Sequence, residues 1–550
     1  MRSLLALAVT GMALTSAAVP TSAQTLLLPP ASGGVSSSQG DAPVRRLSLE
    51  DAVRLALERN LGLQVERYNP QIQDLSVAAA RAAWTPTLTA TVDDGTSNVP
   101  SSSLFAGALG KVTRDQFATT LGWQQALPWG VTYAVAWGNA RVRSNGLFDT
   151  PNPAVGSTIT GSFVQPLARD FGIDRARAQV RVAKTRSDLS RIEVTQATRK
   201  TIRSVKVAYW ELAYARSSLA VRRQSLDLAR AALGDSRSRL AAGMAARLDV
   251  VEAEAEVAQR AEAVIVGEAG VSGAEDRLRA LVFDPAAADF WTTTLELTDT
   301  GTVQPTPMEA DAAIRRALEQ RADLQAARKN VEIADTDIRY WRNQALPDVR
   351  VQVDHALAGQ AGTTVRFGPG FPPPIVGREY AGYGRALGNL IDNKSWSVSL
   401  SVAYPIGTSA AEADLARTTL LRNQAQASIR NLELRIATEV RGAGRQVNMN
   451  AKRIEATRVA RQLAAERLDA EQKRRAAGMS TTFLVFQAQR DLAQALDAEL
   501  RSTLAYDTSL AEFEAVQEIP SVGPSATPIT GTGAPSAASF VRAAVQTARP

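Results

Sequence analysis

The stretch Ala241-Ala242-Gly243-Met244 decides the fold, because it returns 235 residues later as Ala476-Ala477-Gly478-Met479. Before the first copy, apolar residues recur every seven positions: Leu240, Leu233, Leu226, Leu219, Leu212 and Val205. At the same offset the second half supplies Leu468, Ile454, Val447 and Val440, and only Arg475 and Arg461 break the match. A shared tetrapeptide in register with a shared heptad phase indicates two copies of one long helical hairpin. The glycine suits the end of a helix, where a residue without Cβ takes the left-handed turn.

The duplication extends to the short helices that precede each hairpin. At an offset of 261, Ala52-Val53 matches Ala313-Ile314, and Pro86 matches Pro347. Ser48 predicts a helix start, and a second helix is expected from Leu61 to Trp84 with a disturbance at Pro70.

Composition excludes several kinds of chemistry. The chain has 550 residues with no cysteine and one histidine, His355, so disulfides, cysteine nucleophiles and multi-histidine metal centres are excluded. We expect no metal and no cofactor. The 62 basic residues are interleaved with 55 acidic ones along helices, which indicates a solvated charged surface and not a nucleic-acid site.

The N-terminus predicts the compartment. Met1-Arg2-Ser3 is followed by an apolar run to Ala18, and small residues precede Gln24. We interpret residues 1–23 as a cleaved secretory signal peptide, with no cysteine to carry a lipid anchor. No later run reaches the ~18 apolar residues of a membrane helix, so any membrane entry is expected through β-strands.

Alternating segments between the short and long helices predict these strands. In Trp396 to Tyr404, one face is Trp, Val, Leu, Val and Tyr, and the other is serine and alanine. This pattern is typical of a membrane strand with a wet opposite face, although a half-buried strand of a soluble sheet is an alternative. Further strands are expected at 88–92, 159–163 and 349–353, and an extra hairpin at 117–141 leaves open whether the whole chain has four or six strands.

The predicted organisation is a signal peptide (1–23), a flexible linker (24–46), a first repeat (47–282) and an inter-repeat linker (283–306). A second repeat (307–518) and a disordered tail (519–550) follow. Strands are expected at about 87–164 and 348–404, and the hairpin tips at Gly243 and Gly478. The first long helix is expected to begin near Pro166 and to run for ~105 Å.

Four to six strands are too few for a closed membrane barrel, which begins at about eight strands. Open strand edges are not tolerated in hydrocarbon, so the barrel must be shared between several chains. Helices of ~105 Å cannot fit within a bilayer core of ~30 Å, and they are expected to project into the periplasm. The sequence therefore predicts a duct, mainly α with membrane β-strands.

These features resemble the TolC-like outer-membrane efflux factors. The similarity rests on Leu47 to Ala52, Leu57 to Asn60, Ala82 to Pro86, Gln165 to Leu167 and Gly243 to Val251, in this order. The resemblance implies a homotrimer in the outer membrane of a Gram-negative bacterium, in contact with its lipid. It also implies a periplasmic adaptor and an inner-membrane pump, and a role as exit duct of a tripartite efflux or type I secretion system.

The resemblance places adaptor docking at the tips, with Gly243, Met244, Gly478 and Met479. The family's closed gate has an acidic pair six and nine residues after the second glycine, where this chain has Leu484 and Gln487, and Ser480 replaces the gate arginine. Asp249 and Glu252 of the first tip are therefore candidate gate or lumen residues. For Asp249 the alternative is a helix N-terminal carboxylate.

Two other classes of protein, an enzyme and a structural protein, are alternatives to the channel. An enzyme is disfavoured, because His355 stands alone and Glu252, Glu254 and Glu256 spread over different helix faces. A periplasmic coiled-coil structural protein without channel activity is the stronger alternative, since heptads predict helices whatever their task. The signal peptide and the amphipathic strands favour the channel.

Overall fold

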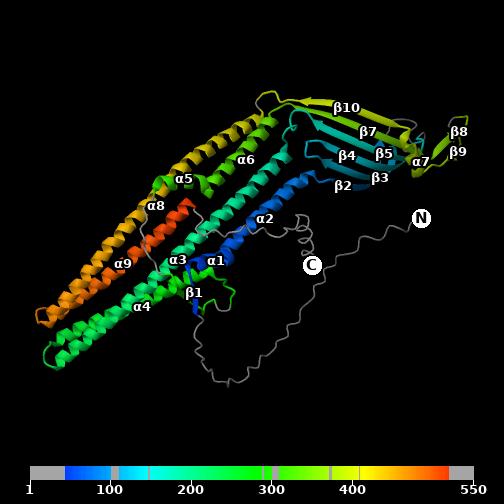
Figure 1. The fold of residues 1–550 in the computed structure, drawn as a ribbon. Helices are drawn as coiled ribbons and strands as arrows, with labels where there is room; N and C mark the ends of the chain where they lie inside the picture. The colour runs from blue at the N-terminus through cyan, green and yellow to red at the C-terminus, as the bar shows by residue number, and fades with distance from the viewer. Residues whose placement is uncertain are drawn as a thin grey trace, which may run out of the picture.

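The computed structural model describes residues 44–100, 111–146, 149–287, 290–299, 309–370, 374–407 and 409–518. The molecule is elongated, with long helices on one side and a sheet at the far end of them (Figure 1). The predicted signal peptide 1–23, most of the linker 24–46 and the tail 519–550 lie outside the described residues.

Helices form two similar series, one in each half of the chain. The first series is α1 (Leu49–Arg59), α2 (Leu61–Arg81), the 3-10 helix η1 (Ala82–Trp84), α3 (Arg175–Ala241) and α4 (Arg247–Val282). The second is α5 (Ala310–Gln320), α6 (Ala322–Gln344), α7 (Tyr383–Gly388), the 3-10 helix η2 (Asn389–Ile391), α8 (Ala410–Ala476) and α9 (Thr482–Gln517). Both α3 and α8 have 67 residues, which is ~100 Å of helix.

Six strands make one antiparallel sheet in the order β10-β7-β5-β4-β3-β2. Their bounds are β2 (Thr87–Pro100), β3 (Lys111–Ala126), β4 (Thr132–Ser144), β5 (Ala154–Pro166), β7 (Asp348–Gly362) and β10 (Lys394–Ala403). The segment 117–141, predicted as an extra hairpin, thus forms β3 and β4 within the same sheet. The count of four strands is therefore too low, and six is the number in this sheet.

Each half buries its own apolar core between short and long helices. The first core joins Leu47, α1, α3, α4 and Leu295, and the second joins α5, α6, α8 and α9. The heptad residues Val205 and Leu212 lie in the first core, and their partners at the offset of 235, Val440 and Val447, lie in the second. The repeat read from the sequence is therefore a repeat of packing.

The two cores differ in which helix carries the larger side chain at one pair of corresponding positions. Tyr209 is fully buried in the first core, and its partner at the same offset is Gly444. A Cβ on Gly444 would lie 3.4 Å from the ring of Phe513, which occupies the place of Leu278 in the first half. In the first core the larger residue, Tyr209, is on the long helix α3 and the smaller one is on α4. In the second core the larger residue, Phe513, is on the returning helix α9, and the long helix α8 has glycine.

Three sequence-based expectations need correction. The strand β5 continues through Pro166, and α3 begins only at Arg175, where Asp174 accepts a hydrogen bond of 2.7 Å from the Arg177 N–H. Helix α2 runs from Leu61 to Arg81 through Pro70 without a break, and only Leu63 and Val77 of its residues are buried. His355 lies within β7 and not at a strand end, and its Nδ1 is 3.0 Å from the Ser395 carbonyl oxygen.

Four short strands were not predicted. The strands β1 (Val44–Leu47) and β6 (Thr294–Leu297) pair in parallel, although the sequence suggested only linkers there. The strands β8 (Thr364–Phe367) and β9 (Ile375–Glu379) form a separate hairpin near α7. Four- and five-residue strands are too short to show a clear alternation, so their pairing depends on the surrounding fold.

Candidate functional site

One face of the sheet carries a broad band of apolar side chains in its half nearer the helices, while Asp94, Asn139 and Arg141 lie on the same face further out. Its register places Ala90 opposite Leu121, Leu121 opposite Trp137, Trp137 opposite Ile159, and Ile159 opposite Leu357. By the two-residue alternation of strands, further members of this face are Leu88, Val92, Trp123, Val135, Phe163, Val351, Val353, Trp396, Val398, Leu400 and Val402. Many of these side chains are exposed, and Trp396 is 77% exposed. A water-facing sheet would not leave such an area uncovered.

The opposite face is small and polar. There Thr91 lies opposite Thr120, Thr120 opposite Gly138, and Gly138 opposite Thr158. On the same face, towards the β10 edge, Ser397 lies opposite Asp354, which lies opposite Ser162. A sheet that is apolar on one face and hydroxyl-rich on the other suits a wall between hydrocarbon and water.

A polar chain ties the sheet to the short helices. The Trp123 indole N–H donates to the Tyr133 hydroxyl over 3.3 Å, and that hydroxyl donates to Gln125 Oε1 over 2.7 Å. The Gln125 amide in turn donates to the Trp84 carbonyl over 2.9 Å. These three hydrogen bonds connect β3 and β4 to Trp84, just after the end of α2.

At the far end of the long helices, the two hairpin turns have the same geometry. Gly243 has φ +69° and Gly478 has φ +73°. The Met244 N–H donates to the Arg239 carbonyl and the Met479 N–H to the Arg474 carbonyl, each over 2.8 Å. These bonds satisfy the last helical carbonyls in the way that a left-handed glycine permits. Both tips therefore present the same backbone shape.

The predicted tip residues occupy different environments. Met244 and Met479 are each 74% exposed. The carboxylate of Asp249 accepts a hydrogen bond of 3.0 Å from the Ala246 N–H, so it caps α4. Glu252 lies one turn further and is half-buried. In the second tip, Leu484 stands at the start of α9, where its N–H donates to the Thr481 hydroxyl over 3.4 Å.

In the half of the hairpins nearer the tips, two ion pairs that the sequence did not reveal join α3 and α4 to α8 and α9. Arg475 Nη2 lies 2.8 Å from Asp235 Oδ2, which connects α8 to α3. Glu256 on α4 is 6% exposed and lies 3.0 Å from Arg490 on α9. The break in the heptad pattern at Arg475 was the available signal, because a basic residue at an otherwise apolar position must find a partner.

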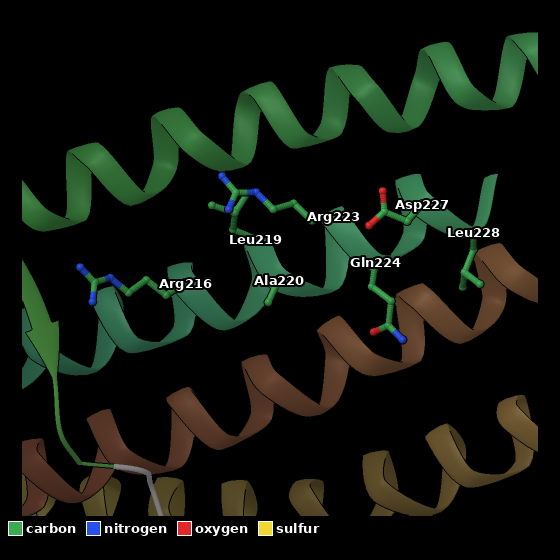
Figure 2. Close-up of a pocket in the computed structure, with 7 residues that line it drawn as sticks. All are labelled: Arg216, Leu219, Ala220, Arg223, Gln224, Asp227 and Leu228. Atoms are coloured by element: carbon green, nitrogen blue, oxygen red, sulfur yellow. The ribbon is translucent and has the colours of Figure 1, made fainter. Parts of the chain in front are cut away.

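A groove follows one face of α3 where α4 and α9 flank it (Figure 2). It is lined by Arg216, Leu219, Ala220, Arg223, Gln224, Asp227 and Leu228, all from α3. Arg223 is held by Glu268 of α4 at 2.8 Å, and Leu228 is 42% exposed. This mixed apolar and charged stripe has no covering helix from the described part of the chain.

Within the described residues, no group of three or more His, Cys, Asp or Glu side chains is arranged to hold a metal ion. Among the helices of that part of the chain, none combines the length and apolar composition that crossing a membrane requires.

A two-faced sheet carried on paired helical hairpins defines a membrane-protein architecture of the outer-membrane efflux class. The family model described as "Outer membrane efflux protein" matches residues 154–282 and 313–516. The chain belongs to this family, and it is an outer-membrane efflux channel and not an enzyme. No curated protein matches the chain.

Solved structures share the fold at low sequence identity. A membrane protein from Pseudomonas aeruginosa is 17% identical, with a TM-score of 0.61 over 85% of this chain and 93% of that one. VceC of Vibrio cholerae is 18% identical, with a TM-score of 0.59 over 85% and 96%. The CmeC channel of Campylobacter jejuni is 11% identical, with a TM-score of 0.60 over 90% and 94%.

Proposed function

We propose that three copies of this chain form one tube, the exit duct of a tripartite efflux or type I secretion system. The observation that carries the proposal is the sheet with one apolar and one polar face, joined to two hairpins of ~100 Å. The sheets line a passage through the outer membrane, and the helices line a passage through the periplasm. Conduction is passive, and the tube opens at its helical end.

The helices need further copies to enclose a passage. Two hairpins from one chain make a curved wall and not a closed tube. The stripe on α3 from Arg216 to Leu228 is partly exposed in one chain, with Leu228 and Arg223 exposed and Leu219 buried, and combines leucine with charged side chains (Figure 2). Such a surface suits contact with a second helical wall, because long charged side chains cover apolar neighbours with their methylene groups.

The helical tips dock to a periplasmic adaptor, which connects the duct to an inner-membrane pump. Gly243 and Gly478 support this assignment, because their turns have matching backbone geometry and a Cβ at either would meet nothing within 4 Å. Met244 and Met479 beside them supply exposed, adaptable apolar contacts. Six equivalent tips in a trimer would offer the adaptor a ring of similar sites.

Residues 1–23 direct export to the periplasm and are removed, and the mature protein carries no lipid anchor. The mass and N-terminal sequence of protein purified from membranes would test this, with a start at Gln24 as the expected result. A chain that keeps its leader would contradict it.

The principal test is electron microscopy of the mature protein purified in detergent from membranes. Hollow three-fold tubes well over 100 Å long are expected, since the helices alone span ~100 Å. Water-soluble rods without association would instead support a coiled-coil structural protein. Restoration of drug or protein export in a strain without its own channel is the functional counterpart.

A further inference from the structure

The two outer strands of the sheet have no partner within it. They are β2 and β10, and both are exposed along their whole length. Each offers a row of backbone N–H and C=O groups beside apolar side chains, which is a template for another strand. Within hydrocarbon these groups must be paired, because no water is present to replace the missing bonds.

The duplication indicates what pairs with them. Proline 86 before β2 matches Pro347 before β7, and Pro166 at the end of β5 matches Pro405 after β10. The pairing of β5 with β7 therefore joins the last strand of the first repeat to the first strand of the second. The equivalent seam joins the last strand of the second repeat, β10, to the first strand of a first repeat, β2. Since β2 lies at the far edge of the same sheet, that β2 belongs to another copy.

We propose that β10 of each copy pairs with β2 of the next, and that three copies close a barrel of eighteen strands. This rests on the trimer of the proposed function and adds its seam, its register and its strand number. Successive strands of the six-stranded sheet are antiparallel, so an even number brings β10 and the next β2 together in antiparallel orientation.

The β5–β7 pair also supplies the register. Pro166 lies opposite Arg350 in that seam. Transfer through the matching prolines places Pro405 opposite Thr89, Val402 opposite Val92, and Lys394 opposite Pro100. Every residue of β10 then has a partner in β2, whose fourteen residues reach beyond it at the end near the helices.

The transferred register keeps the faces of the sheet in order. Val402 and Val92 meet on the apolar face, and Ser401 meets Asp93 on the polar face. A shift by one residue would turn the apolar side chains of one strand towards the wet face, so the agreement excludes any register displaced by an odd number of residues.

The strand number sets the width of the passage. Barrel diameter grows roughly linearly with strand number, and barrels of 16–18 strands leave an aqueous channel. Eighteen strands give a barrel about one and a half times as wide as the twelve that four strands per copy would make. The outer-membrane part of the duct is therefore porin-like in width.

Cysteine cross-linking tests the seam, and the chain has no native cysteine to interfere. Val92→Cys and Val402→Cys are combined in one chain and oxidised in membranes. Residues directly opposite in an antiparallel pair have Cα atoms about 4.5–5.5 Å apart, within the range for a disulfide. We expect a covalent trimer on a denaturing, non-reducing gel that reverts to monomer with reductant.

The matched control combines Val92→Cys with Val398→Cys, on the same face but four residues along β10, or ~13 Å out of register. It should give little cross-linking, as should each single variant. Thr91→Cys with Ala403→Cys repeats the test on the opposite face, in case the first pair fails to insert.

The outcomes separate the seam from the proposed function. Three-fold tubes that export but do not cross-link at either in-register pair would overturn the seam and leave the duct. Stronger cross-linking of the Val398 control would overturn the register. Absence of tubes together with absence of cross-links would overturn both proposals.

Discussion

Arg475 and Asp235 lie 240 residues apart in the chain, and their side chains form an ion pair of 2.8 Å that joins the two hairpins near their tips. The Arg475 side chain is 14% exposed, whereas Asp235 is 45% exposed and also contacts Arg239 at 3.1 Å. The pair lies close to the tips, and if the proposed tube opens at its helical end, the two hairpins move apart here.

Breaking this pair should open the tube more often. Arg475→Ala leaves the partly exposed Asp235 without its cross-hairpin contact, at a cost of up to ~1 kcal/mol. We expect conductance in planar bilayers to rise about two- to five-fold, because ~1 kcal/mol changes an open-to-closed ratio by about that factor. Lys473→Ala is the control, since its 2.6 Å contact with Asp469 lies within α8. Equal conductance of both variants would contradict a latch at Arg475.

Bulk at the tips should block docking without preventing membrane insertion. Gly243→Trp and Gly478→Trp should each abolish export, because the new side chain occupies space that an adaptor must approach. The left-handed backbone adds a strain of only ~1–2 kcal/mol. Export is measured as drug resistance, and insertion as the amount of protein in the outer-membrane fraction. Gly243→Asn is the control, since asparagine tolerates this conformation, and its export should be retained. Full export by both tryptophan variants would exclude docking here.

Asp249 allows its two roles to be separated. Asp249→Ala removes both the cap on the Ala246 N–H and the charge, and it should lower the free energy of unfolding by ~1 kcal/mol. Asp249→Asn keeps a capping oxygen and removes only the charge. If the carboxylate narrows the lumen, both variants raise conductance. A conductance change in neither would show that Asp249 serves only as a cap.

Asp507 should make stability depend on pH. Burial on α9 raises the pKa of Asp507 to about 6. The folded chain thus holds this proton more tightly than the unfolded chain, whose aspartate pKa is about 3.9. The free energy of unfolding should therefore fall as pH rises from about 3.9 to about 6, and stay lower above that range.

Asp507→Asn removes this loss. We expect a stabilisation on the order of 1 kcal/mol at pH 8 and little change at pH 4, after discounting for the partial exposure of the carboxylate. Thermal unfolding in detergent at the two pH values measures it. Asp497→Asn is the contrasting variant and should destabilise, because its carboxylate accepts hydrogen bonds from Tyr214 at 3.1 Å and Ser218 at 2.9 Å. A pH-independent Asp507→Asn would argue against a raised pKa.

Many helices and strands of this fold can be predicted from the sequence, because the patterns that indicate them are local and occur twice. The returning helices α4 and α9 begin and end where periodicity predicts, at Arg247–Val282 and Thr482–Gln517. The segments expected as strands at 349–353 and 396–404 lie in β7 and β10, which pair with one another. The glycines at the hairpin tips and the two internal offsets of 235 and 261 residues carry this information.

The features that the sequence did not reveal depend on contacts between distant segments. Nothing near Asp235 indicates that Arg475 is its partner, and nothing near Val44 indicates a parallel strand at Thr294. The start of α3 was misplaced by several residues, because arginine and alanine continue the helical composition up to a cap at Asp174. The docking role of the tips stays a prediction.

The parallel pair of β1 and β6 has a consequence for the order of folding. It joins Leu47 to Leu297, and the first core gathers residues between 47 and 295. The second core draws only on residues from Ala313 onwards. A chain that enters the periplasm from its N-terminus can therefore bury its first core before the second half has emerged. The duplication therefore allows stepwise folding, in which the first half forms its core while the second half is still being exported.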